Sequence, residues 1–318
     1  MFPIDLPALF LDEIRGSRRP NDGLLHASTD LAGSLRHSQL RLADAPVNDR
    51  ELADEIRLAH GTLWHEWFHD TLEKHGVPFF HEVPLKDFMP EGWSGTADWV
   101  FWHPDYKAFV LGDLKTARGE AMYWIERDGA KKEHIWQLSA YFYALLKMGL
   151  PMVKGFAVMY WPMNNVGGEL ILPSVQECDP IPEELVVKEM ETRWELSKKY
   201  LDEFGKGYSA KNPSDFINEY LAPPMEREQK LYWSKQYKSF EVKLMPHWTS
   251  KFCPYDDELC DCSQQGTTKI GQWVFSPDHL TDRGDVWSYE ARKGYEEIEP
   301  MVQPSKSEQD KRAKEANG

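Results

Sequence analysis

The chain has 318 residues, with 37 Lys and Arg against 52 Asp and Glu, which gives a formal net charge of −15. No apolar stretch reaches the roughly 20 residues that a membrane helix needs, and the start lacks the basic residues and cleavage site of a secretory signal. Four cysteines are too few for a disulfide framework, so we expect a cytoplasmic protein. The acidic total does not exclude a nucleic-acid partner, because DNA binding depends on a local basic groove.

The pattern of apolar residues predicts alternating helices and strands. Apolar residues recur at three- and four-residue spacing in four segments, which we expect to be helices over 31–42 (capped by Ser28, Thr29 and Asp30), 49–75, 131–148 and 183–204. Short segments rich in aromatic and branched residues lie between Pro, Gly and Asp, and we expect strands over 81–85, 96–102, 108–115, 155–161 and 169–172. This order predicts an α/β core, with a mixed central sheet flanked by helices.

Changes in composition divide the chain into four parts. We expect an N-terminal helical segment over 1–50 that packs on the core, and the α/β core itself over 51–205. A C-terminal extension over 206–303 is rich in Pro, Tyr, Trp and Lys, contains three of the four cysteines, and is expected to be irregular. The tail over 304–318 has no aliphatic residue larger than alanine, which is typical of disorder.

Charged residues near the ends of two neighbouring strands indicate a cation site. Asp113 and Lys115 are two apart and therefore share a face of their strand, where a carboxylate can hold a hard cation and an ammonium can hold a phosphate oxygen. Asp98 lies in an apolar stretch of the preceding strand, and a hairpin through residues 103–107 would bring it beside Asp113. Two acids that meet in a core need a cation or a base between them. A salt bridge from one of them to an Arg is the alternative.

The flanking helices carry polar residues that could complete such a site. Gln137 and Tyr141 are four apart and point from one helical face. Lys131, Lys132 and His134 stand at the start of the same helix, where they could contact DNA phosphate. An imidazole on the preceding helix, that of His65, suits a metal that accepts nitrogen, such as manganese. Taken singly, each also fits an ordinary surface or structural role.

In order and spacing, these residues resemble the motifs of a known nuclease clade. The motifs are Gly61-xxx-His65, Gly95-Thr96-Ala97-Asp98, Gly112-Asp113-Leu114-Lys115-Thr116 and Gln137-xxx-Tyr141. Together they resemble the RecB clade of PD-(D/E)XK nucleases, which includes CRISPR-adaptation nucleases and phage recombination exonucleases. The match covers about residues 55–165, so the resemblance makes residues 51–205 a nuclease core.

The resemblance implies a restriction-endonuclease-like core that binds Mg²⁺ or Mn²⁺. The implied metal ligands are His65, Asp98, Asp113 and the carbonyl of Leu114. Lys115 would position the attacking water or stabilise the pentavalent phosphorus, while Gln137 and Tyr141 would hold the DNA strand; Glu82 is a further candidate for the cleft. The implied activity is that of an exonuclease which hydrolyses phosphodiester bonds in DNA recombination, DNA repair or phage DNA processing. Its partners would be single-stranded DNA or duplex ends, and recombination or replication proteins.

A second motif on the same helix predicts different chemistry. The run from His65 to His69 is a literal HExxH, in which two histidines bind zinc and Glu66 is the general base of a metalloprotease. However, Leu72 stands where the extended zinc-protease pattern needs glycine, and the two aspartates would then have no role. A catalytically inactive DNA-binding subunit with the nuclease fold is another alternative.

The cysteines of the extension predict a structural metal site. A tetrahedral zinc site could be formed by His247, Cys253, Cys260 and Cys262. The resemblance implies instead a four-cysteine iron–sulfur cluster, although the spacing departs from that pattern and its N-terminal cysteine is missing, since that segment reads Ser34-Leu35-Arg36. Cys178 could substitute for it only if the fold brings it close. Three reduced cysteines without a metal are the third possibility.

Overall fold

The computed structural model describes residues 21–48, 52–204, 216–217, 219–223, 228–234, 239–245, 253–255, 260 and 268–273. The chain divides into two compact units, one of residues 1–223 and 254–259 and the other of residues 224–253 and 260–318. Among the helices in the described ranges, none is both long and apolar enough to cross a membrane.

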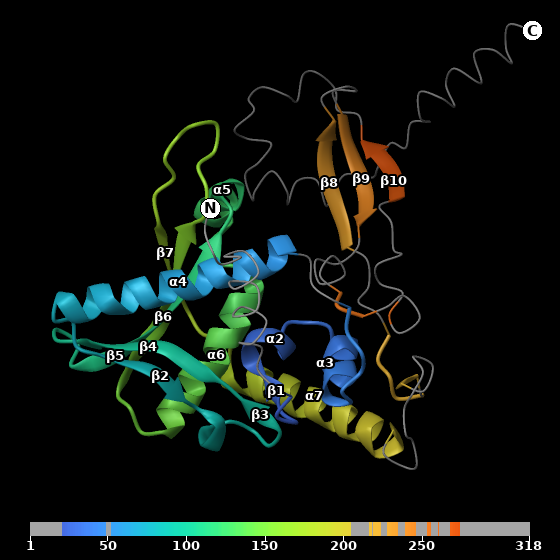
Figure 1. Cartoon of the computed structure of the whole chain (residues 1–318), viewed down its shortest axis with the longest axis horizontal. Helices are drawn as coiled ribbons and strands as arrows, with labels where there is room; N and C mark the ends of the chain where they lie inside the picture. The colour runs from blue at the N-terminus through green and yellow to red at the C-terminus, as the bar shows by residue number, and fades with distance from the viewer. Residues whose placement is uncertain are drawn as a thin grey trace, which may run out of the picture. The chain divides into compact units, whose positions relative to one another are not determined.

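A five-stranded mixed sheet in the order β2-β4-β5-β6-β7 forms the centre of the first unit (Figure 1). β5 and β6 run parallel, and the other neighbouring strands run antiparallel. The strands are β2 (Phe79–Pro84), β4 (Thr96–His103), β5 (Ala108–Ala117), β6 (Met152–Pro162) and β7 (Ser174–Cys178). With helices flanking it, this sheet confirms the predicted fold class.

Helices lie on both faces of the sheet. Successive strand residues point to opposite faces: the ring of Trp99 contacts Phe68 of α4, with centroids 4.9 Å apart, whereas Asp113 on the other face contacts Gln137 of α6. The helices α5 and α6 connect β5 to β6, because parallel neighbours need a long crossover. The main helices are α4 (Leu52–Lys74), α5 (Gly119–Asp128), α6 (Lys132–Lys147) and α7 (Glu183–Phe204).

The described part of the N-terminal segment packs against the core through short elements. β1 pairs in parallel with β3, and α3 packs on α7. After β3 the chain continues directly into β4, so this pairing places the residues around β1 beside the sheet. The elements are β1 (Leu25–His26), α2 (Ala27–Asp30), α3 (Leu35–Leu42), η1 (Lys86–Phe88) and β3 (Trp93–Ser94).

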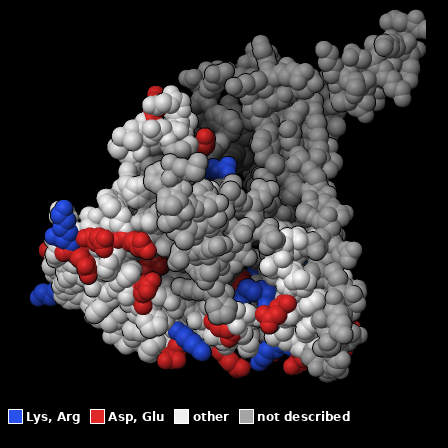
Figure 2. Space-filling view, viewed as in Figure 1, with Lys and Arg blue, Asp and Glu red and all other residues white. Residues whose placement is uncertain are grey.

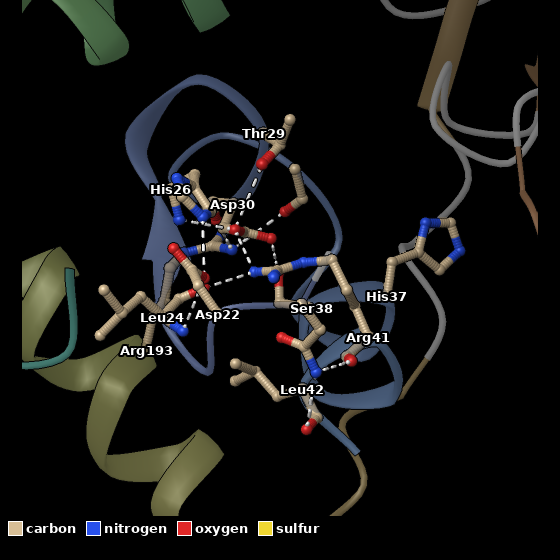
Figure 3. Close-up of polar contacts among 12 residues, drawn as sticks. Asp22, Leu24, His26, Thr29, Asp30, His37, Ser38, Arg41, Leu42 and Arg193 are labelled. Carbon is tan, nitrogen blue, oxygen red and sulfur yellow. Dashed lines mark hydrogen bonds and ion pairs between the residues drawn. The ribbon is translucent and has the colours of Figure 1, made fainter. Parts of the chain in front are cut away.

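A buried carboxylate ties this segment together (Figure 3). Asp30 accepts hydrogen bonds from the His26 backbone N–H, the Ser38 hydroxyl and the Arg41 guanidinium, each at 2.7 Å. Its own carbonyl accepts a hydrogen bond from Arg193 of α7, also at 2.7 Å. These bonds satisfy a buried charge, and they fix residues 22–30 relative to α7.

Two predicted boundaries were wrong, and one α-helix longer than four residues was not predicted. The helix expected from Leu31 begins at Leu35, with Ser34 as its cap, because the chain turns sharply at Gly33, where a Cβ would lie 2.2 Å from the Thr29 carbonyl oxygen. The strand expected over 169–172 is a connection, and the strand itself begins at Ser174. The unpredicted helix is α5, which is short and half exposed.

In the second unit, three antiparallel strands form a sheet in the order β10-β9-β8. They are β8 (Glu228–Ser234), β9 (Ser239–Met245) and β10 (Thr268–Trp273). The sequence predicts irregular structure in this extension, and these strands are not among the predicted elements.

Candidate active site

The two aspartates of the predicted cation site stand where β4 and β5 separate. Paired rungs run from His103–Ala108 to Trp99–Gly112, and the next residue of each strand is an aspartate, Asp98 or Asp113. β4 then continues along β2 and β5 continues along β6, so the two strands form a fork. Within the fork, the edge of β5 that faces β4 is free to contact side chains from other elements.

Asp113 is almost completely buried, with 3% of its surface exposed. Its Oδ1 atom accepts hydrogen bonds from Lys115 Nζ at 3.0 Å and from Gln137 Nε2 at 3.4 Å. Its Oδ2 atom is also buried and has no hydrogen-bond donor among the described residues when Asp98 is ionised, whereas a protonated Asp98 forms a hydrogen bond with Asp113. A buried carboxylate oxygen without a partner is unfavourable, and a divalent cation would satisfy it.

The charges in the fork repel one another strongly. Burial, followed by the negative charge of Asp113, raises the pKa of Asp98 to about 7. The side chain of Asp98 is 24% exposed, so a cation or proton from solvent can reach it. Burial by itself lowers the pKa of Lys115, but the two aspartates raise it further than burial lowers it, so this lysine remains an ammonium.

His65 reaches the same fork from α4. Its Nε2 atom lies 2.9 Å from the Leu114 carbonyl oxygen and its Nδ1 atom 3.6 Å from Asp98 Oδ2. Burial lowers the pKa of His65, so the ring is neutral at pH 7, and Nε2 must carry the proton because a carbonyl can only accept. The Nδ1 lone pair therefore faces a carboxylate, and a cation between the two would suit both groups. This arrangement fits a metal ion, although the carbonyl and imidazole expected to be ligands are hydrogen-bonded to each other.

Gln137 and Tyr141 of α6 are buried at the fork and do not lie on the helix surface. The Tyr141 hydroxyl makes hydrogen bonds with Ser28 and Gln137, and burial together with the two aspartates raises its pKa. A Cβ atom at Gly95 would lie 2.4 Å from Cε1 of this tyrosine, so only glycine fits there.

Apart from Asp113 and Leu114, which are buried behind it, these groups line a cavity of about 330 Å³. Part of its wall comes from the N-terminal segment, in which Asp22 Oδ1 lies 3.1 Å from His26 Nε2. This pair gives no signal in the sequence, because a spacing of four outside a regular helix is not periodic. The cavity is lined by Asp22, His26, Ser28, His65, Glu82, Ser94, Gly95, Thr96, Asp98, Lys115, Gln137 and Tyr141.

The basic residues at the start of α6 do not line this cavity. Lys131 and Lys132 are exposed. Burial lowers the pKa of His134 to about 3, and its Nδ1 atom lies 2.7 Å from the Tyr160 hydroxyl, which also accepts a hydrogen bond from the backbone N–H of Lys131. His134 is therefore neutral. The contact of Lys131, Lys132 and His134 with DNA phosphate stays a prediction.

The two histidines of the HExxH motif have different partners. While His65 contacts the fork, His69 Nε2 lies 3.4 Å from Glu73 Oε1 and its ring centroid lies 4.3 Å from that of His81. The helix also continues through Leu72 as far as Lys74.

Only part of the predicted cysteine site lies in the described residues. The Sγ atoms of Cys253 and Cys260, both in the second unit, lie within 4.8 Å of each other, which allows a shared metal. His247 and Cys262 lie outside the described residues. Cys178 belongs to β7 in the first unit, where burial raises the pKa of its thiol. The zinc and iron–sulfur interpretations remain predictions.

Comparison with known proteins gives distant similarities of structure alone. No family model matches the chain, and no curated protein sequence matches it. A structure of LHK-Exo in complex with dAMP is 13% identical with a TM-score of 0.40, over 57% of this chain and 89% of that one. A structure of the same alkaline exonuclease, from Laribacter hongkongensis, is 13% identical with a TM-score of 0.37, over 60% and 93%. At these values the similarity carries no functional argument, so the function is inferred from the fork itself.

Proposed function

We propose that this chain is a metal-dependent DNA nuclease of the PD-(D/E)XK type, related to the RecB clade. The observation that carries the proposal is the fork between β4 and β5, where Asp98 and Asp113 meet next to the ammonium of Lys115. When Asp98 is ionised, the buried Oδ2 atom of Asp113 has no donor, and this atom and the Nδ1 lone pair of His65 both favour a cation there. A surface ion pair would not require this convergence in a buried position.

The residues of the fork divide into two roles. Asp98 and Asp113, with the Leu114 carbonyl and His65, would hold Mg²⁺ or Mn²⁺. Such an ion would lower the pKa of a coordinated water and offset charge on the phosphate. Lys115, which is oriented by its hydrogen bond to Asp113, would position the attacking water and stabilise the developing negative charge on the phosphate.

The other cavity residues bear on the substrate. Gln137 and Tyr141 present polar groups to the cavity and would hold the DNA strand beside the scissile bond. The preference for exonuclease activity, and a place in recombination, repair or phage DNA processing, rests on the family resemblance. A zinc ion or iron–sulfur cluster at the cysteines would be structural.

A cleavage assay with end-labelled linear DNA, single-stranded and duplex, and with circular DNA tests this proposal. We expect cleavage in Mg²⁺ or Mn²⁺ but not in EDTA, with linear DNA degraded and circular DNA intact. Lys115→Ala and Asp113→Ala should each lose at least about a hundredfold in rate. Lys107→Ala is the matched control, because this exposed lysine lies in the turn at the opposite end of the β4–β5 hairpin. Cleavage that persists in Lys115→Ala would contradict the assignment, and DNA binding without cleavage in any metal would support the inactive-subunit alternative.

A further inference from the structure

Three tryptophans form a cluster on the α4 face of the sheet. Trp64 and Trp67 come from α4 and Trp161 from β6. Their ring centroids are 5.4 Å apart for Trp64–Trp67, 4.7 Å for Trp64–Trp161 and 5.3 Å for Trp67–Trp161, so each ring contacts both others. Trp67 is 47% exposed and the other two are half-buried. Much apolar aromatic surface is therefore open to solvent at one point.

The cluster is directly connected to the fork through both of its elements. Trp161 is paired in register with Thr116, the residue after Lys115 on β5. Trp64 is the residue before His65 on α4. Because successive strand residues alternate, Trp161 and Lys115 lie on opposite faces of the sheet but on adjacent rungs. A DNA strand bound at Lys115 would therefore have to pass the end of β5 to reach the tryptophans.

We propose that Trp64, Trp67 and Trp161 form a stacking subsite for the unpaired bases of a DNA strand whose phosphate lies in the fork. This inference rests on the proposed function. Bases stack on aromatic rings without regard to sequence, as a nuclease that degrades a strand progressively requires. In a duplex the base faces are covered by their neighbours, so the subsite selects single-stranded DNA.

The distribution of charge indicates the path of the strand. Exposed acidic residues occupy the C-terminal half of α4, namely Glu66, Asp70 and Glu73, and Figure 2 shows acidic side chains along this part of the molecule. They repel phosphate there. Arg118, which is exposed, directly follows β5 and stands two residues after Thr116, the residue that is paired with Trp161. The phosphates would therefore pass Lys115 and Arg118, with their bases turned toward the tryptophans.

Binding in EDTA tests the subsite apart from cleavage. Full-length protein is titrated with fluorescein-labelled oligo(dT) and with a duplex of equal length, and anisotropy is recorded. We expect Trp67→Ala to weaken oligo(dT) binding about tenfold, with little change for the duplex, and Trp67→Phe to keep most of the affinity. Trp124→Ala is the matched control, since Trp124 is also 47% exposed but belongs to α5; its affinity should be unchanged.

Thermal unfolding of each variant distinguishes stacking from packing. An unchanged oligo(dT) affinity in folded Trp67→Ala protein would overturn the proposal, as would equal losses for oligo(dT) and duplex. Equal losses in Trp67→Ala and Trp124→Ala would also overturn it, because the effect would then not be specific to the cluster. Since no metal is present, selective oligo(dT) binding would support the subsite even if the protein cleaved no DNA. A lack of cleavage would count against the nuclease proposal alone.

Discussion

Glu82 stands opposite Asp98 in the register of β2 and β4, at a position where the two strands are not paired, and its backbone is in the left-handed region at φ 50°. The rungs on either side of these two residues are paired, and both side chains line the cavity. A left-handed conformation costs a residue other than glycine about 1–2 kcal/mol. A strained acid that faces another acid is unfavourable for the fold alone, which suggests that Glu82 serves the cation site.

We therefore expect Glu82→Gln to weaken metal binding and to stabilise the metal-free protein. Removing this charge lowers the pKa of Asp98, since Glu82 contributes to raising it. The Mg²⁺ concentration that gives half-maximal cleavage should rise about tenfold, which corresponds to about 1.4 kcal/mol. Glu73→Gln, on an exposed turn of α4, is the control. If Glu82→Gln and wild-type protein respond to Mg²⁺ alike, Glu82 has no part in the site.

Metal binding should release protons near neutral pH. The pKa of Asp98 is about 7 without metal, so a substantial fraction of this side chain is protonated at pH 7 and must lose its proton to bind a cation. The affinity for Mg²⁺ should therefore fall as the pH is lowered from 8 to 6. Calorimetric titration in two buffers of different ionisation enthalpy measures the release. Heats that are identical in both buffers at pH 7 would show that no proton leaves.

The raised pKa of Asp98 also predicts how the stability of the metal-free protein depends on pH. The folded state binds the Asp98 proton more tightly than the unfolded state does. The contribution of this proton to the free energy of unfolding is therefore fully present below about pH 4 and is lost as the pH rises through about 7. Asp98→Asn removes the charge, and should raise the melting temperature more at pH 8 than at pH 5, by about 2–4 °C for each kcal/mol recovered. An equal rise in melting temperature at both pH values would show that the ionisation of Asp98 is not the cause, whatever the effect of the substitution on cleavage.

Gly95→Ala should damage the cavity from the α6 side. Its Cβ atom would lie 2.4 Å from Cε1 of Tyr141, so the buried tyrosine would have to move. We expect a loss of about 1–3 kcal/mol in the free energy of unfolding and slower cleavage. Gly61→Ala is the stability control, because its Cβ would meet only the Thr116 hydroxyl at 3.8 Å in mid-helix, where alanine is favoured. Normal stability and cleavage in Gly95→Ala would show that Tyr141 has room to shift.

The centre of the site could be predicted from sequence because local rules place it. Period-two alternation puts Asp113 and Lys115 on one face, and a short turn brings Asp98 alongside, as the observed register has it. The spacing of Gln137 and Tyr141 likewise places both on one face of α6, but it does not reveal that this face is buried.

The rest of the cavity depends on contacts between residues distant in sequence. Asp22 and His26 reach it through the parallel pairing of β1 with β3 and the hydrogen bonds of Asp30, which no local pattern reveals. The tryptophan cluster needs the β5–β6 register to bring Trp161 to α4. The sequence shows that residue 82 is acidic, but it does not reveal the left-handed backbone conformation of Glu82.

The most direct test of the shared cation is a count of bound Mn²⁺ by electron paramagnetic resonance, in wild-type protein and in Asp113→Asn at pH 8. Asparagine keeps the shape of the side chain but removes the charge. The account predicts one Mn²⁺ held at the fork in the wild-type protein and at least about a hundredfold weaker binding in the variant, since a ligand charge is lost. Equal binding in both proteins, or none in either, would contradict it.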